Sequence, residues 1–134
     1  MEHQERISRL RLIRTQNIGP VTFRLLLQRF GTAVKALAAI PEISARGGRK
    51  LTPISKDEAE AELDAVEKAG AALLIFGENA YPKRLENYED APICLSYKGH
   101  IALLNKQALA IVGARNASLN ACRLTQKFAQ ALGA

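Results

Sequence analysis

The sequence predicts a mixed α/β fold, in which a helical first part precedes the first strands of a parallel sheet. Apolar residues recur at helical spacing, with polar residues between them, from about residue 4 to residue 69. After Gly70 the pattern changes to short continuous apolar runs, which are typical of buried strands. Strands that alternate with helices indicate an α/β layer. We therefore expect a helical domain over residues 1–70 and a sheet domain over residues 71–134.

The composition favours a globular protein without a membrane segment. The chain has 134 residues, of which 48% are hydrophobic, so it can bury one good core or two small ones. Its apolar runs are far shorter than a bilayer requires, and its polar N-terminus lacks a signal core. We expect a cytoplasmic protein with no membrane association. Cys94 and Cys122 do not have metal-ligand spacing, and we expect both to be reduced.

The positive charge is concentrated in the first part of the chain. The net charge is +6, but residues 1–56 hold eleven Lys and Arg against three acidic residues. A basic segment of this kind suggests a polyanionic partner. A solvated basic face explains the same composition equally well.

Five helices are expected in the first part, separated by Gly and Pro residues. Their predicted ranges are 4–15, 21–30, 32–40, 41–48 and 55–69. Ser55 and Glu58 have the spacing of a capping box at the start of the last helix. The basic segment Arg46–Lys50 is expected to be a mobile loop, or a solubilising turn between helices.

The segment Ile18-Gly19-Pro20-Val21-Thr22 resembles the hairpin of helix-hairpin-helix modules. In those modules, backbone N–H groups at the turn face a DNA phosphate, and a helix N-terminus beside a glycine suits an anion. Gly19, with Arg14 and Arg24 on either side, is therefore a possible secondary DNA contact. The alternative is that Gly19 only allows a tight turn between two helices.

The second part contains three expected strands, with short helical segments between them. The strands are predicted over residues 71–76, 93–97 and 109–112, and short helices over residues 82–85 and 101–104. A final helix is expected to begin after Ser118, which can cap it, and to reach Leu132.

The turn between the third strand and the final helix is the main candidate site. A strand, a glycine turn and a helix N-terminus form the usual phosphate-binding arrangement of open α/β sheets. A dinucleotide-binding turn would have a second glycine where Arg115 stands, whereas an arginine suits a phosphodiester. The alternative is that Arg115 pairs with a carboxylate such as Asp90. The predicted DNA-binding residues are Gly113, Ala114, Arg115, Asn116 and Ser118.

Four motifs in the second part resemble the DprA/Smf family (DNA-processing protein A). They are Tyr81-Pro82-x-x-Leu85, Asp90-Ala91-Pro92-x-x-Leu95-x-x-Lys98-Gly99, Leu103-Leu104 and Ile111-Val112-Gly113-Ala114-Arg115-x-x-Ser118. The helical first part is also similar to the small helical domain of that family. The resemblance implies a helical domain like those of SAM and helix-hairpin-helix proteins, followed by the beginning of a Rossmann-like parallel sheet.

The resemblance also implies a function in DNA processing, natural transformation (competence) and homologous recombination. Proteins of this family bind single-stranded DNA, help to load the RecA recombinase and act as homodimers. The resemblance implies neither an enzymatic activity nor a cofactor. It places Arg115 in a positively charged DNA pocket. Two departures are Ala121, where the family usually has glycine, and the end of the chain at Ala134, which suggests a truncated Rossmann-like domain.

Two other function classes remain open on the sequence alone. A nucleotide hydrolase or phosphoribohydrolase could hold a mononucleotide phosphate at Gly113, although no His, Cys or carboxylate constellation is placed for catalysis. We predict no catalytic residues and no metal site. The helical part could instead be a protein-interaction module only.

Overall fold

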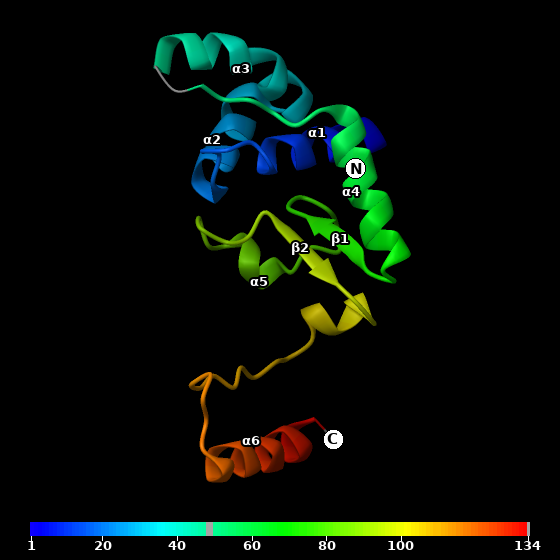
Figure 1. The fold of residues 1–134 in the computed structure, drawn as a ribbon, viewed down its shortest axis with the longest axis vertical. Helices are drawn as coiled ribbons and strands as arrows, with labels where there is room; N and C mark the ends of the chain where they lie inside the picture. Colours follow the sequence, from blue (N-terminus) through cyan, green and yellow to red (C-terminus); the bar gives the residue numbers. More distant parts are fainter. Residues whose placement is uncertain (48–49, 134) are drawn as a thin grey trace.

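The computed structural model describes residues 1–47 and 50–133, in which helices precede a two-stranded sheet (Figure 1). The expected mixed α/β class, with the helical part first, is confirmed. None of the helices in these residues is long and apolar enough to cross a membrane. The elements are α1 (His3–Ile13), α2 (Pro20–Phe30), α3 (Ala33–Gly47), α4 (Lys56–Lys68), β1 (Ala72–Ile75), α5 (Lys83–Glu86), β2 (Cys94–Tyr97), the 3-10 helix η1 (Ile101–Asn105) and α6 (Leu119–Leu132).

Two turns set the directions of α1, α2 and α3. Asn17 has a φ of 69°, and Pro20 occupies the first turn of α2, where its missing N–H costs nothing. Gly31 ends α2 with a φ of 78°, and its N–H donates to the Leu27 carbonyl. The predicted breaks at these positions are confirmed.

The region after Gly31 contains one helix where we predicted two. α3 runs continuously through Pro41, although proline usually ends a helix because it lacks an N–H and collides with the preceding turn. Ile40 is buried and Ile43 packs against the same apolar cluster, so packing on both sides of Pro41 supports the helix. In the predicted basic loop, Arg46 and Gly47 belong to α3, and Gly48 and Arg49 lie outside the described residues.

The capping box at the start of α4 is confirmed. The Ser55 hydroxyl accepts from the Glu58 N–H at 3.1 Å, and the Glu58 carboxylate accepts from the Ser55 N–H at 2.7 Å. The bond from the Ser55 backbone, aided by its hydroxyl, lowers the pKa of Glu58 from its ordinary value. α4 packs Ala59, Leu63 and Val66 against the neighbouring apolar cluster.

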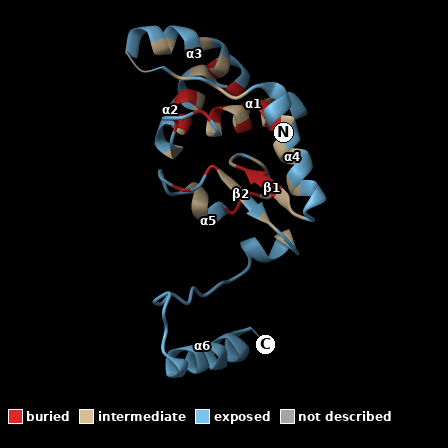
Figure 2. Cartoon of the chain, in the orientation of Figure 1, coloured by how far each residue is buried: buried red, intermediate tan, exposed pale blue. Residues whose placement is uncertain are grey.

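The sheet departs from the prediction in two respects. β1 and β2 pair antiparallel, with Ile75 opposite Cys94, whereas we predicted parallel strands. The connection between them contains only α5, and a parallel pair needs a longer crossover. Residues 109–112, predicted as the third strand, pair with no strand in the described chain. Residues 102–133 are exposed throughout (Figure 2), so no edge or core holds that segment as a strand.

Side chains occupy the outer edge of β1. The Arg6 guanidinium donates to the Leu73 carbonyl at 2.8 Å, and the Glu78 carboxylate accepts from the Ile75 N–H at 2.9 Å. Arg6 and Glu78 also form an ion pair at 2.8 Å. Arg6 of α1 and Glu78, which follows β1, therefore make hydrogen bonds that another strand would otherwise make on this side.

Two apolar clusters join the helices to the sheet. The first combines buried side chains of the helical part with Ile93, and the second combines Ile7, Leu10 and Ala59 with Leu73 and Ile75. Each cluster thus contains residues from both sides of position 70. The division into domains at residue 70 stays a prediction.

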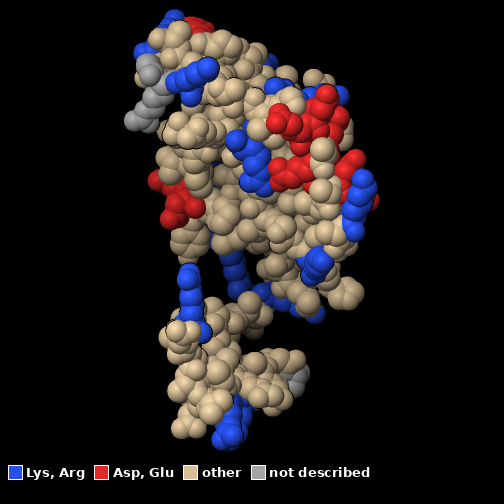
Figure 3. Space-filling view, in the orientation of Figure 1, with Lys and Arg blue, Asp and Glu red and all other residues tan. Residues whose placement is uncertain are grey.

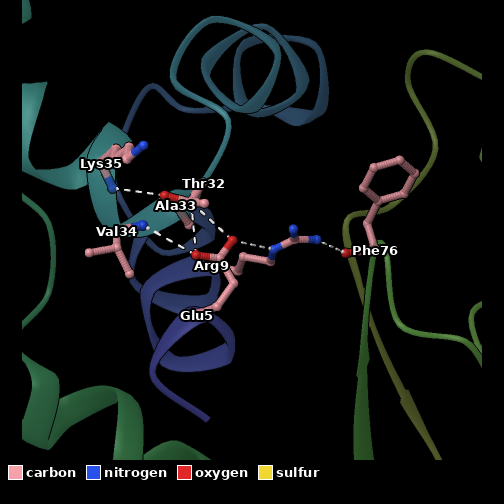
Figure 4. A network of polar contacts seen from close by, with 7 residues as sticks. All are labelled: Glu5, Arg9, Thr32, Ala33, Val34, Lys35 and Phe76. Carbon is pink, nitrogen blue, oxygen red and sulfur yellow. Dashed lines mark hydrogen bonds and ion pairs between the residues drawn. The ribbon is translucent and has the colours of Figure 1, made fainter. Parts of the chain in front are cut away.

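A carboxylate from α1 caps the N-terminus of α3 (Figure 4). Glu5 accepts from the Ala33 N–H at 2.9 Å and 3.0 Å and from the Val34 N–H at 3.3 Å. Arg9, one turn later, donates to Glu5 at 2.8 Å and to the Phe76 carbonyl at 2.5 Å. These bonds connect α1 with α3 through Glu5 and with the end of β1 through Arg9.

The approach of Arg9 explains a glycine in the sheet part. Gly77 has a φ of 87°, which L side chains rarely adopt, and a Cβ there would collide with the Arg9 guanidinium. A glycine at this position thus allows the helical part to pack closely against the end of β1.

We expect Glu5→Gln to lower the free energy of unfolding by about 1–3 kcal/mol, because it weakens the α3 cap and leaves Arg9 without its carboxylate. Both side chains are only 15% exposed, so solvent screens the pair weakly. Urea unfolding followed by circular dichroism measures the change. Glu89→Gln, at an exposed position, serves as the control and should change stability by less than about 0.5 kcal/mol. Equal effects of the two substitutions would contradict this assignment.

Candidate functional site

The turn before α6 is open to solvent. Gly113, Ala114, Arg115 and Asn116 are all exposed, and a Cβ added at Gly113 would meet no atom within 4 Å. Ser118 caps α6, since its hydroxyl accepts from the Ala121 N–H at 3.3 Å. The helix N-terminus next to this turn has a partial positive charge, which favours an anion beside Arg115.

Apolar side chains lie on the other side of the same segment. A groove of about 550 Å³ is lined by Leu109, Ala110, Ile111 and Val112 on one side and by Phe128 and Leu132 of α6 on the other. Residues 109–112 and α6 therefore face each other as a strand and its following helix would, even though no strand forms. The turn with Arg115 therefore connects the two apolar walls of this groove, residues 109–112 and α6.

The alternative role of Arg115 was an internal ion pair. Among residues 1–47 and 50–133, no carboxylate lies within 4.0 Å of the Arg115 guanidinium, and Asp90 forms no ion pair either. An unpaired and exposed guanidinium can donate hydrogen bonds to two oxygens of a phosphate without breaking an existing bond.

A small cleft brings together two of the other predicted residues. Gly19 and Arg14 line a cleft of about 180 Å³, and its opposite wall is formed by residues 92–94. Gly19 is exposed, and no side chain caps the N-terminus of α2. The hairpin therefore faces the beginning of β2 across this cleft, and an anion bound there would contact both parts of the chain.

Arg14 has an internal partner within this cleft. Its guanidinium makes two hydrogen bonds to one oxygen of Glu62, at 2.5 Å and 3.1 Å, and one to the other oxygen at 2.9 Å. This hydrogen bonding raises the pKa of Arg14 above its ordinary value, and the charge is fully retained. Glu62 offsets much of the positive potential that Arg14 would otherwise present to a polyanion.

Arg24, the third predicted contact on the helical part, points toward the sheet part. Its guanidinium carbon lies 4.0 Å from the centroid of the Phe76 ring, and one nitrogen donates to the Glu86 carbonyl at 3.4 Å. Its Nε and second terminal nitrogen are buried and have no partner in the described residues. Arg24 thus contributes to packing between α2 and the segment after β1, and a DNA contact would require this packing to open.

Other basic residues of α1 are also bound internally. Arg6 and Arg9 donate to the Leu73 and Phe76 carbonyls, as described above, and Arg11 donates to the Ile54 carbonyl at 2.7 Å. Figure 3 shows acidic side chains gathered where α4 lies, with basic ones among them, so that face is not uniformly positive. The positive charge of residues 1–56 is therefore partly used to hold the fold.

No local pattern in the sequence identifies the residues that close the hairpin cleft. Ile93 and Cys94 lie far along the chain from Gly19, and only the packing of Ile93 in the first apolar cluster brings them together. The described residues contain no group of three or more His, Cys, Asp or Glu that could hold a metal ion.

Comparison with known proteins assigns both parts of the chain. The family model of the DprA-like N-terminal HHH domain matches residues 3–65. The family model of DNA recombination-mediator protein A matches residues 72–134. No curated protein matches the chain at the significance required.

The two cysteines differ in environment, and we expect them to differ in reactivity. Burial raises the pKa of the Cys94 thiol above its ordinary value, whereas Cys122 is exposed on α6. At pH 7.5, Cys122 should react with a maleimide at least tenfold faster than Cys94, because the thiolate is the reacting form. Mass spectrometry of the two tryptic peptides measures both rates. Equal rates in the folded protein would contradict the placement of Cys94, and a denatured sample provides the reference.

Proposed function

Because this chain belongs to the DprA/Smf family of DNA recombination mediators, we propose that it binds single-stranded DNA through the turn at Arg115. The observation that carries the proposal is the exposed guanidinium of Arg115, unpaired among the described residues, next to the N-terminus of α6. The family match supports a function in DNA processing and recombination, and the single-stranded substrate is our inference.

Binding would rest on contacts to the phosphate backbone. Arg115 would hold a phosphate by charge-assisted hydrogen bonds, and backbone N–H groups at Gly113–Asn116 and the α6 N-terminus would face the same anion. Such contacts carry no sequence information, so we expect binding with little dependence on base sequence. The affinity should fall steeply as salt concentration rises.

The hairpin cleft is a second candidate contact on the same DNA. Gly19 lies at an uncapped helix N-terminus, which suits a phosphate, and Arg14 lines the same cleft. Because Glu62 already binds Arg14, we expect a smaller contribution from this cleft than from Arg115. Arg24 would contribute least, since its guanidinium lies against Phe76.

The family also indicates how such binding would be used. We infer that the protein helps to load the RecA recombinase onto single-stranded DNA during natural transformation and homologous recombination. It would act in the cytoplasm, as a homodimer, without a cofactor and without catalysing a reaction. These statements rest on the family and on no contact described above.

We expect Arg115→Ala to raise the dissociation constant for a single-stranded oligonucleotide about 10- to 100-fold at low salt. A hydrogen bond to a charged group contributes about 1.5–3 kcal/mol, and 1.4 kcal/mol is tenfold. Fluorescence anisotropy with a labelled thymidine oligonucleotide measures the affinity. The dependence of log K on log salt should also become shallower by about 0.7–1.

Arg84→Ala is the matched control for this experiment. It removes one exposed arginine that forms no ion pair in the described part of the chain. Its effect should stay below about threefold. If both substitutions weaken binding equally, the interaction is only a general charge effect, and the assignment of Arg115 is wrong.

A nucleotide hydrolase or phosphoribohydrolase is the alternative function for the same turn. A mononucleotide should then raise the melting temperature at millimolar concentration, and Arg115→Ala should abolish the shift. We expect oligonucleotides, but not AMP, ATP or NAD, to raise the melting temperature. A thermal-shift series with equal phosphate concentrations distinguishes these outcomes. A shift with a mononucleotide alone would favour the hydrolase.

A further inference from the structure

A shallow groove lies where the end of α2 meets the second half of α3. It has a volume of about 280 Å³, close to the lower limit of about 300 Å³ for pockets that hold drug-sized ligands. A groove of this size suits a single planar group. Its lining residues are Arg29 and Phe30 of α2 and Ala39, Glu42, Ile43, Arg46 and Gly47 of α3.

The groove combines an aromatic and aliphatic floor with a cationic rim. Phe30 and Ile43 are partly buried and pack against the first apolar cluster, and this packing fixes their positions. Arg29 is exposed, and its guanidinium carbon lies 5.2 Å from the centroid of the Phe30 ring. An arginine that lies over an aromatic ring can also stack its other face on a second planar group.

The cations at this groove are more available than those of α1. None of the ion pairs in the described residues includes Arg29, and Arg46 pairs only with Glu42 on its own helix. The side chains of Arg46 and Glu42 are 74% and 63% exposed, so water screens this pair and it can exchange partners. Figure 3 shows basic side chains gathered at this end of α3, together with acidic ones.

A further cation lies near the same end of the helix. The Leu51 N–H donates to the Ser44 hydroxyl at 3.1 Å, which places the segment beginning at Lys50 beside α3. Lys50 is exposed. Arg29 and Arg46 line the groove together with one carboxylate, Glu42, and Lys50 adds a positive charge near the same end of α3.

We propose that this groove binds one unpaired base of single-stranded DNA, stacked on Phe30, with Arg29 and Arg46 at the neighbouring phosphates. An aromatic platform inside a positively charged groove is how proteins hold single strands without reading their sequence. The proposal rests on the proposed function and adds a base-contacting subsite on the helical part. An acidic peptide would use the same cations but would gain less from a flat aromatic floor.

The test compares a thymidine oligonucleotide with an abasic oligonucleotide of equal length. Both carry the same phosphates, so a preference for the first measures contacts to bases. We expect the full chain to prefer the thymidine strand at least fivefold, since stacking of one base contributes about 1–3 kcal/mol. Phe30→Leu should reduce that preference toward unity and leave the affinity for the abasic strand unchanged. Arg29→Gln should weaken binding of both strands.

Two variants provide matched controls. Tyr88→Leu removes an aromatic side chain that is 62% exposed on the sheet part, and it should leave the preference unchanged. Arg84→Gln removes a charge away from the groove and should leave both affinities within about threefold. Circular dichroism verifies that each variant is folded, which matters because Phe30 also packs on the core.

Photocrosslinking provides a second measurement on the unmodified protein, should Phe30→Leu fail to fold. Trypsin cleaves after Arg29 and Lys35, so Phe30 is the single aromatic residue of the peptide 30–35. A crosslink from a 5-iododeoxyuridine oligonucleotide to this peptide supports the subsite, and crosslinks confined to other peptides would overturn it.

The outcomes separate this inference from the proposed function. If the thymidine preference survives Phe30→Leu while Arg115→Ala weakens binding, DNA binding stands and the subsite is wrong. If an acidic peptide competes at the groove and DNA does not bind there, the subsite is likewise wrong. If the full chain binds neither oligonucleotide, the proposed function itself fails.

Discussion

The Glu5 carboxylate and the Arg9 guanidinium, one turn apart on α1, connect α1 with α3 and with the end of β1 by hydrogen bonds. Glu5 adds a second cap to α3 beside Thr32, whose hydroxyl accepts from the Lys35 N–H, and Arg9 donates both to Glu5 and to the Phe76 carbonyl at the end of β1 (Figure 4). Gly77 leaves the space for that approach. The orientation of α3 relative to α1, the packing of both apolar clusters and the position of the hairpin cleft all depend on this connection, because each requires α1 to lie between α3 and the sheet.

This arrangement changes how the charge of the chain is interpreted. Residues 1–56 contain eleven Lys and Arg, and a surplus of this size suggests a polyanion-binding face. In the structure, Arg6, Arg9 and Arg11 bond to carbonyl oxygens, and Arg14 and Arg24 are bound by Glu62 and Phe76. Charge composition therefore overstates the positive potential of α1. Two exposed arginines outside α1, Arg115 at the turn before α6 and Arg29 beside Phe30, form no ion pair in the described residues.

Features set by local chemistry could be predicted from the sequence, and features set by distant packing could not. The caps at Ser55 and Ser118 and the break at Gly31 depend on neighbouring residues, and they are confirmed. Pro41 favoured a helix boundary, but packing of Ile40 and Ile43 overrides it. The direction of strand pairing depends on the connection between β1 and β2. Leu109–Val112 has no strand partner in the part of the chain that the structure describes, and its apolar pattern needs one. For the candidate site, the sequence indicated the Arg115 turn but not the internal bonds of Arg14 and Arg24.

The occupied outer edge of β1 makes the sheet asymmetric. The Leu73 carbonyl and the Ile75 N–H are already bonded to Arg6 and Glu78, so they are not free to pair with an incoming strand. Among the described residues, no side chain covers the outer edge of β2 in this way. A further strand, from the same polypeptide or from another, would therefore pair with β2 and not with β1. Two charged side chains, Arg6 and Glu78, thus cover this edge of the sheet without a covering strand, which is a way that proteins protect an edge from pairing with another chain.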